Sequence, residues 1–322
     1  MHYIMHMDVS AASKNQGDFI ITEAVNNIIE EVFPKAFVVN IPTHLPTSSK
    51  TLKDYEKFKL RFVGGTNLLH NLMGIPLFQQ WKNLGFTAYK QLRPAILLGV
   101  GWANYEEKKV PFYTRNLLQK VLSKDFQHSV RDEYTKLKLA EAGITNVINT
   151  GCPTMWNLTE DHCSTIKAQK SNEVVFTLTD YRVNEERDKK IIDVLVHNYE
   201  KVYFWPQGSG DYEYFLSLSN NPKIEIINSS LKSYDELLNS TEDIDYVGTR
   251  LHAGIRALQH KRRAIIVAVD NRAKEISKDT RLVVCDEKEI DSLDTMIASE
   301  IRYKLNINFE AINKWKSQFA NL

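Results

Sequence analysis

Residues 245–258, DYVGTRLHAGIRAL, predict a strand that runs directly into a helix. An apolar strand comes first, and Leu251, Ile255 and Leu258 then recur at helical spacing, which turns one face of the helix toward a sheet. A strand joined to a packed helix is the repeating unit of parallel α/β sheets. This stretch therefore places the chain in the α/β class.

Both halves of the chain repeat this unit. The apolar runs that predict strands are residues 3–7, 36–41, 60–63, 95–98, 128–130, 146–149, 174–179, 201–205, 224–227, 246–248, 264–269 and 282–284. Between these strands, apolar residues recur at helical spacing. The clearest case is Ile21, Val25 and Ile28, which precede Pro34, where the helix ends. The alternation predicts a mostly parallel, doubly wound sheet in each half.

The 322 residues are enough for two such domains. Residues 160–172 are polar and lack a clear period, so they are the expected linker. We predict an N-terminal Rossmann-like domain over residues 1–165, a C-terminal Rossmann-like domain over 166–302, and a C-terminal helix in 303–322 that packs back on the first domain. Ligands bind beyond the carboxyl ends of parallel strands, so the cleft between two facing domains is the expected site.

The charge balance and the missing motifs exclude several classes of function. The 41 basic and 40 acidic residues nearly cancel, so nucleic acid is not an expected partner and any anion site must be local. We expect the basic residues 261–263 to be solvated in a loop, and Asp243 and Asp245 to be surface charges that bind no metal. P-loop, zinc-protease and serine-hydrolase motifs do not occur.

The sequence favours a cytoplasmic location. It shows neither a signal peptide nor an apolar stretch approaching the roughly 18 residues of a membrane span. Its three cysteines form neither an even disulfide framework nor a zinc pattern, which favours a reducing compartment. A polymeric or lipid-linked substrate could still bring the protein to a membrane surface. The oligomeric state stays open.

The predicted helix start after residue 248 carries the strongest candidate site. Thr249 can cap the helix, and Arg250 and His252 lie in its first turn, where free backbone N–H groups and the helix dipole already favour an anion. Cations are locally unfavourable there, which indicates that a negative ligand binds. The alternative is an Arg250 paired with a neighbouring carboxylate and a His252 that only packs on the helix.

Other candidates lie at turns that follow predicted strands or begin helices. Each could contact a ligand or reflect ordinary turn and capping chemistry, and turn chemistry is favoured for Arg182 and Gln207. The candidates are Asn15, Gly17 and Asp18 before the first helix, Gly65 after a strand, Arg131 at a strand-to-helix turn, and Arg182, Gln207, Asp270 and Arg272 in the second half. Asp18 is the preferred catalytic carboxylate among them.

Taken together, these segments resemble the polysaccharide pyruvyltransferase family. The matching pieces follow the family's order over residues 15–285: Asn15-Gln16-Gly17-Asp18, Gly64-Gly65, Ser129-Val130-Arg131-Asp132-Glu133 with Leu137 and Gly143, and Arg250-Leu251-His252 with the strand after it. The chain departs from the family at Thr66, where a third glycine is common, and near Asp270-Asn271-Arg272, where a tyrosine and a lysine are common.

The resemblance implies two Rossmann-like domains of the glycosyltransferase-B-like type that face a cleft, with the acceptor on the first domain and the donor on the second. It implies transfer of pyruvate as a ketal from phosphoenolpyruvate to a sugar of a surface polysaccharide or its precursor, with no further cofactor. The family associates the arginine and histidine of this motif, here Arg250 and His252, with the donor. The chemistry of the residues themselves makes Arg250, Leu251, Thr249 and Arg131 the candidates to hold the donor, and His252 and Asp18 the candidates to move protons.

Two other functions remain open for the same fold. A glycosyltransferase with a nucleotide-sugar donor would also use a helix start that favours phosphate. A sugar-binding or regulatory protein would bind glycans without turnover.

Overall fold

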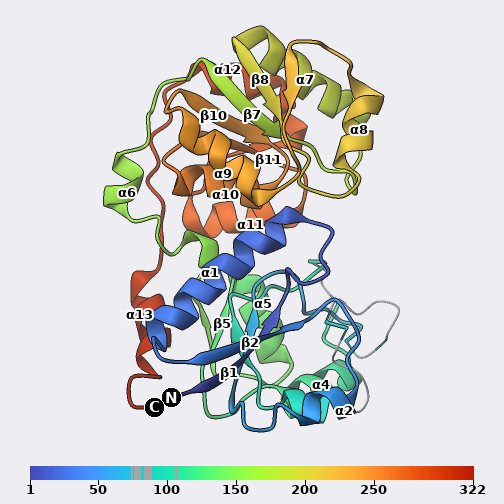
Figure 1. Ribbon diagram of the computed structural model, residues 1–322, viewed down its shortest axis with the longest axis vertical. Coiled ribbons are helices and arrows are strands. Elements are labelled where there is room, and N and C mark those ends of the chain that lie inside the picture. The colour runs from blue at the N-terminus through green and yellow to red at the C-terminus, as the bar shows by residue number, and fades with distance from the viewer. Residues whose placement is uncertain (74, 76–80, 83–88, 106–107) are drawn as a thin grey trace. The chain divides into compact units, whose positions relative to one another are not determined.

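The computed structural model describes residues 1–73, 75, 81–82, 89–105 and 108–322. The chain divides into two compact units (Figure 1). Unit 1 comprises Met1–Ser13, Ile21–Trp156 and Ile307–Leu322, and unit 2 comprises Lys14–Ile20 and Asn157–Asn306. Each unit carries parallel strands with helices between them, which confirms the predicted α/β class.

Unit 1 is built on a four-stranded parallel sheet in the order β2-β1-β3-β4. A separate parallel pair is formed by β5 and β6. The strands are β1 (Tyr3–Asp8), β2 (Phe37–Pro42), β3 (Leu60–Gly64), β4 (Ile96–Leu98), β5 (His128–Val130) and β6 (Val147–Asn149). The helices are α1 (Gln16–Val32), whose first turn belongs to unit 2, α2 (Ser49–Lys53), α3 (Tyr89–Leu92), α4 (Phe112–Val121), α5 (Glu133–Glu141), the 3-10 turn η1 (Pro153–Met155) and α13 (Phe309–Ser317).

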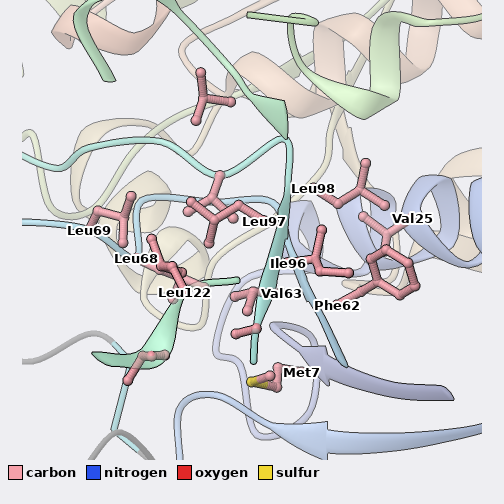
Figure 2. Close-up of a cluster of buried hydrophobic side chains, with 14 of the residues drawn as sticks. Met7, Val25, Phe62, Val63, Leu68, Leu69, Ile96, Leu97, Leu98 and Leu122 are labelled. Carbon is pink, nitrogen blue, oxygen red and sulfur yellow. The ribbon is translucent and has the colours of Figure 1, made fainter. Parts of the chain in front are cut away.

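The core of unit 1 joins the sheet to its helices. Phe62 of β3 and Ile96 and Leu98 of β4 lie close to Val25 of α1 (Figure 2). The C-terminal helix α13 contributes the buried Trp315, whose ring packs on Phe62. Continuous apolar runs of this kind form strands because both faces of a parallel sheet are covered.

His128 of β5 is a buried histidine that should make the stability of the protein depend on pH. Its Nε2 lies 2.9 Å from the Ser123 carbonyl oxygen, and its Nδ1 accepts a hydrogen bond from the Leu97 amide at 3.2 Å. This arrangement fits the neutral ring. Burial lowers the pKa of His128 to about 4, and the Ser123 carbonyl offsets only part of that effect.

The sign of the pH dependence follows from this lowered pKa. Above the ordinary pKa of about 6.5 the contribution of His128 is fully present, and it is lost as the pH falls toward 4 because only the unfolded chain takes up the proton there. The loss should reach about 3 kcal/mol. Urea unfolding between pH 7 and pH 4 should show a shallower decline for His128→Gln than for the wild type. Parallel declines would contradict this role for His128.

Unit 2 is built on a six-stranded parallel sheet in the order β12-β11-β10-β7-β8-β9. The chain moves outward from β7 to β9 and then returns to the other side of β7 at β10. The strands are β7 (Glu173–Thr177), β8 (Lys201–Phe204), β9 (Ile224–Ile226), β10 (Ile244–Gly248), β11 (Ala264–Ala268) and β12 (Val284–Asp286). Ligands of open α/β sheets bind at the carboxyl ends of strands where the winding reverses, which here are the ends of β7 and β10.

The helical elements of unit 2 connect these strands. They are α6 (Glu160–Ser164), α7 (Glu185–Asn198), α8 (Asp211–Leu218), α9 (Leu231–Ser240), α10 (Leu251–Gln259), α11 (Asn271–Thr280), the 3-10 segment η2 (Glu287–Ser292) and α12 (Leu293–Ala298).

Residues 157–165, predicted to end the first domain, lie in unit 2. The expected polar linker contains the short helix α6, and Cys163 and Ile166 are buried. His162 bonds the Leu258 carbonyl through Nε2 at 2.8 Å. These contacts attach the segment to unit 2.

Two predicted surface charges are instead buried and paired. Arg263 is 1% exposed and Asp245 is 0% exposed. Arg263 Nη1 donates to Asp245 Oδ2 at 2.7 Å, and Arg263 Nη2 donates to the carbonyls of Met296, Ile297 and Ser299. The prediction that residues 261–263 are solvated was therefore wrong for Arg263, and the prediction of a surface charge was wrong for Asp245. The two side chains neutralise each other at the amino ends of β10 and β11.

Candidate functional site

Strand β10 ends at a close approach to β7. A side chain at Gly248 would place its Cβ 2.7 Å from the backbone of Thr177, so only glycine fits there. Thr249 follows, and its hydroxyl lies 2.8 Å from the hydroxyl of Thr179. The prediction that Thr249 caps the helix was wrong: Arg250 occupies the N-cap position, and its side chain makes no capping hydrogen bond.

The Arg250 guanidinium lies at the carboxyl ends of β7 and β10 and is 3% exposed. Its Nε donates to the Leu178 carbonyl and to Asp211 Oδ2, both at 3.1 Å. Its Nη2 donates to Asp180 Oδ1 at 3.0 Å and to Asp211 Oδ1. The third nitrogen, Nη1, makes no hydrogen bond with the part of the chain that the structure describes.

Burial and pairing act against each other in this ion pair. Burial raises the pKa of the Asp211 carboxyl, while Arg250 and the backbone amides of Gly208 and Asp180 oppose that rise. Burial alone would lower the pKa of Arg250, but Asp211, Tyr181 and Asp180 raise it above its ordinary value. We treat the pair as ionised, because the guanidinium binds both carboxylate oxygens and two amides also donate to them.

A second arginine is joined to the first through a tyrosine. The Arg250 guanidinium carbon lies 5.0 Å from the centre of the Tyr181 ring, and the Tyr181 hydroxyl accepts a hydrogen bond from Arg272 Nη2. Arg272 is also paired with Asp270, which caps α11 and whose charge raises the pKa of Arg272 despite burial. Arg272 Nη1, like that of Arg250, bonds to no described residue.

Tyr181 is 53% exposed and directly precedes the candidate Arg182, in the turn after a predicted strand. We refer to Arg250, Tyr181 and Arg272 as the two-arginine cluster.

The first turn of α1 meets the loop after β8 within unit 2. The Gln207 amide nitrogen donates to Asn15 Oδ1 at 2.7 Å, and the Gln207 carbonyl accepts from the Gln16 amide at 2.9 Å. A Cβ at Gly17 would lie 2.8 Å from the Gln207 amide nitrogen, and one at Gly208 would lie 2.2 Å from Arg250 Nη2. The structure thus brings the predicted residues Asn15, Gly17 and Gln207 toward the loop that borders Arg250.

The remaining predicted residues of unit 2 are spread more widely. Leu251 and His252 are buried in the first turn of α10, next to Arg250 in the chain. Asp18 is buried in the first turn of α1. Arg182 is exposed, and it contributes its carbonyl to the buried Arg187.

Arg131 and Gly65 lie in unit 1. Arg131 is buried and donates to Asn67 Oδ1 at 2.7 Å and to Asp132 Oδ2 at 3.2 Å. Asp132 caps α5, which is the capping role that the sequence offered as the alternative to a ligand contact at this turn. Gly65 has a φ of +50°, and a Cβ there would lie 2.1 Å from Ile21, so its glycine is required by the turn.

The described residues contain neither a cluster of metal ligands nor a helix that could cross a membrane. In the described ranges, no three His, Cys, Asp or Glu side chains are arranged to hold a metal ion. Among the helices of these ranges, none has the length and apolar character that crossing a membrane requires.

Solved structures define the class of fold. The S. aureus MnaA–UDP co-structure has a TM-score of 0.58 at 12% identity, over 100% of this chain and 98% of that one. UDP-GlcNAc 2-epimerase from Neisseria meningitidis, bound to UDP-GlcNAc, has a TM-score of 0.53 at 10% identity, over 100% of both chains. At such low identities the structural similarity shows only the fold. It confirms the predicted two-domain, Rossmann-like, glycosyltransferase-B-like fold.

The sequence itself then gives the family. The family model named polysaccharide pyruvyl transferase matches residues 15–271. The chain therefore belongs to the polysaccharide pyruvyl transferase family, as its motifs predicted. No curated protein matches the chain.

Proposed function

We propose that this protein transfers pyruvate as a ketal from phosphoenolpyruvate to a sugar of a surface polysaccharide or its precursor, including a lipid-linked one. Besides family membership, the two-arginine cluster carries the proposal. It lies where the winding of the unit 2 sheet reverses, and each guanidinium keeps one nitrogen that bonds to no described residue.

The cluster suits a small acid with two anionic groups. Asp211, Asp180 and Asp270 cancel much of the positive charge, so binding would depend on directed N–H donors more than on net charge. Phosphoenolpyruvate offers a carboxylate and a phosphate to two such donors. The carboxylates that hold the guanidiniums would keep both donors oriented before the ligand arrives.

The proposed reaction assigns proton transfers to nearby groups. A proton is delivered to the terminal enol carbon, a sugar hydroxyl attacks the central carbon, phosphate leaves, and a second hydroxyl closes the ketal. His252, in the first turn of α10, is proposed to supply the first proton. Asp18 is proposed to contact the sugar. No cofactor is needed for this sequence of steps.

A cytoplasmic location is part of the proposal. The three cysteines, Cys152, Cys163 and Cys285, are buried and form no disulfide with one another, which supports a reducing compartment.

The proposal predicts phosphate release that requires both substrates. Phosphoenolpyruvate should be mixed with p-nitrophenyl glycosides of galactose, glucose, mannose and their N-acetylated forms, and free phosphate measured while the acceptor is followed by mass spectrometry. Release should depend on one of the acceptors, which gains the mass of a pyruvate ketal. Arg272→Met should lower the rate strongly, whereas Arg302→Met, at an exposed arginine, should not.

Donor choice separates this function from sugar transfer. Phosphoenolpyruvate at 100 times its Kd would stabilise the protein by about 2.7 kcal/mol and raise its melting temperature. The neighbouring structures hold UDP or UDP-GlcNAc, so UDP-sugars are the matched comparison. A shift with UDP-sugars and none with phosphoenolpyruvate would favour the glycosyltransferase instead. Glycan binding with no turnover, unchanged in Arg250→Met, would favour a binding protein.

A further inference from the structure

The segment before α1 pairs with the loop after β8, and both belong to unit 2. The two segments form an antiparallel β-bridge. The Gln16 amide donates to the Gln207 carbonyl at 2.9 Å. The Ser209 amide donates to the Lys14 carbonyl, also at 2.9 Å. These bonds hold Gln207 in place at the carboxyl edge of the unit 2 sheet, which is the edge where ligands of this fold bind.

The hydrogen bonds around Gln207 allow its side-chain amide only one orientation. The Asn15 side chain accepts the Gly17 amide at 3.0 Å, so its accepting atom is the oxygen Oδ1. The Gln207 atom that lies 2.7 Å from this oxygen must then be a donor, which identifies it as Nε2. A Cβ at residue 17 would lie 2.8 Å from this nitrogen, so the glycine there allows the contact. The amide oxygen Oε1 is the atom that is left for another partner.

Oε1 of Gln207 has no such partner. It is buried and accepts no hydrogen bond from any residue that the structure describes, and the whole side chain is only 3% exposed. A buried amide oxygen calls for a donor, because leaving it unsatisfied costs free energy. The loop reaches the surface two residues later, at the exposed Ser209. The missing donor is therefore expected to come from outside the chain.

The chemistry of Oε1 selects the class of ligand. An uncharged acceptor binds an N–H or O–H group. Phosphoenolpyruvate does not supply one, because above pH 7 its carboxylate and its phosphate are both ionised and offer acceptors. A saccharide hydroxyl does supply one. Asp18, which the proposed function assigns to the sugar, lies in the same first turn of α1 that holds Gln207. The next residue of the loop, Gly208, lies against Arg250 Nη2, which a Cβ at this position would overlap.

We propose that Gln207 is a specificity-determining residue, which binds one hydroxyl of the saccharide acceptor through Oε1. This assignment rests on the proposed function. The hydroxyl donates a hydrogen bond and keeps its proton, since an amide oxygen is too weak a base to take it. The amide is held in its orientation before the saccharide arrives, so the contact favours an acceptor with this hydroxyl over the analogue that lacks it. Unit 2 thereby selects the acceptor as well as the donor.

The test combines Gln207→Met with monodeoxy forms of the best p-nitrophenyl glycoside, each of which lacks one hydroxyl. Methionine fills a similar space but is at most a weak acceptor. Titration calorimetry gives the Kd of each glycoside. One monodeoxy form should bind the wild type roughly 3- to 10-fold more weakly than the parent glycoside. Gln207→Met should bind the parent more weakly by a similar factor and should bind the parent and this monodeoxy form equally.

The difference between the two glycosides isolates the contact from a structural effect. Gln207→Met also loses the bond to Asn15, but a disturbed loop would weaken both glycosides alike and leave their ratio unchanged. The phosphoenolpyruvate-induced shift in melting temperature should stay unchanged. Gln169→Met, at an exposed glutamine of the same unit, is the matched control and should keep the wild-type ratio.

The outcomes separate the two proposals. A Gln207→Met variant that discriminates against the monodeoxy forms as strongly as an active wild type overturns the role of Gln207 alone. So does a wild type that binds every monodeoxy form within twofold of the parent, a measurement that needs no variant. A wild type that releases no phosphate with any acceptor overturns the proposed function, and the role of Gln207 with it. If Gln207→Met does not fold, Gln207→Asn keeps an amide but withdraws its oxygen by one methylene. It should lose the discrimination, and full discrimination overturns the role.

Discussion

Arg250→Met is expected to destabilise the protein by roughly 3–5 kcal/mol at neutral pH and to abolish phosphate release. Methionine removes the partner of Asp211, which is 0% exposed, and leaves a buried carboxylate with only the amides of Gly208 and Asp180. It also removes the Nη1 donor proposed to bind phosphoenolpyruvate. The free energy of unfolding from urea titration and the phosphate assay measure the two effects separately.

The destabilisation of Arg250→Met should shrink at low pH. Burial already raises the pKa of Asp211, and loss of the guanidinium should raise it further. A carboxyl whose pKa is raised in the folded state contributes stability below its unfolded pKa of about 3.9, and that stability is lost as the pH rises through the folded value. The variant should therefore lie closer to the wild type at pH 4 than at pH 7.

A double variant distinguishes a structural arginine from one that binds the donor. Arg250→Met combined with Asp211→Asn removes the unpaired charge and should recover much of the lost stability. Phosphate release and the phosphoenolpyruvate-induced thermal shift should stay absent if Arg250 contacts the donor. If phosphate release and the phosphoenolpyruvate-induced thermal shift recovered along with stability, Arg250 would serve only to neutralise Asp211.

Arg263→Leu should lower stability by a similar amount, about 3–5 kcal/mol. It leaves Asp245 buried with the Tyr199 hydroxyl and a weak contact from the Ser171 amide, and it removes the donor for three carbonyls at the end of α12. At about 2–4 °C per kcal/mol, the melting temperature should fall by roughly 6–20 °C. Calorimetry or circular dichroism would measure this shift.

Lys261→Gln is the matched control, because it lies in the same basic cluster but is exposed. Its effect should stay within about 0.5 kcal/mol. Equal effects of the two substitutions would mean that the burial of Arg263 contributes nothing to stability.

Local patterns were enough to predict most of the fold. The apolar runs that predicted β7, β8, β10 and β11 form those strands, because a parallel sheet covered on both faces needs continuous apolar segments. The motif order also predicted the family. Both depend on features that a short window of sequence contains.

Pairings between distant residues could not be predicted in this way. Thr249 resembles a helix cap, but its hydroxyl is engaged by Thr179, which lies 70 positions away in the chain. In the sequence, Arg263 and Asp245 each resemble a solvated surface charge. They form an ion pair because Asp245 lies in β10 and Arg263 directly precedes β11, the neighbouring strand. The fixed direction of the Arg250 guanidinium likewise depends on Asp211, which begins α8 and lies 39 positions away in the chain.

The two-arginine cluster and its supports come from four strand-to-helix connections: Tyr181 from the turn after β7, Asp211 from the start of α8, Arg250 from the N-cap of α10 and Arg272 from the first turn of α11. Arg250 and Asp211 have to be exchanged together, because replacing one of them alone leaves a buried charge unpaired. The turn after β7 that carries the exposed Tyr181 is under less constraint, so grafting this turn between family members is a practical route to altered donor selectivity.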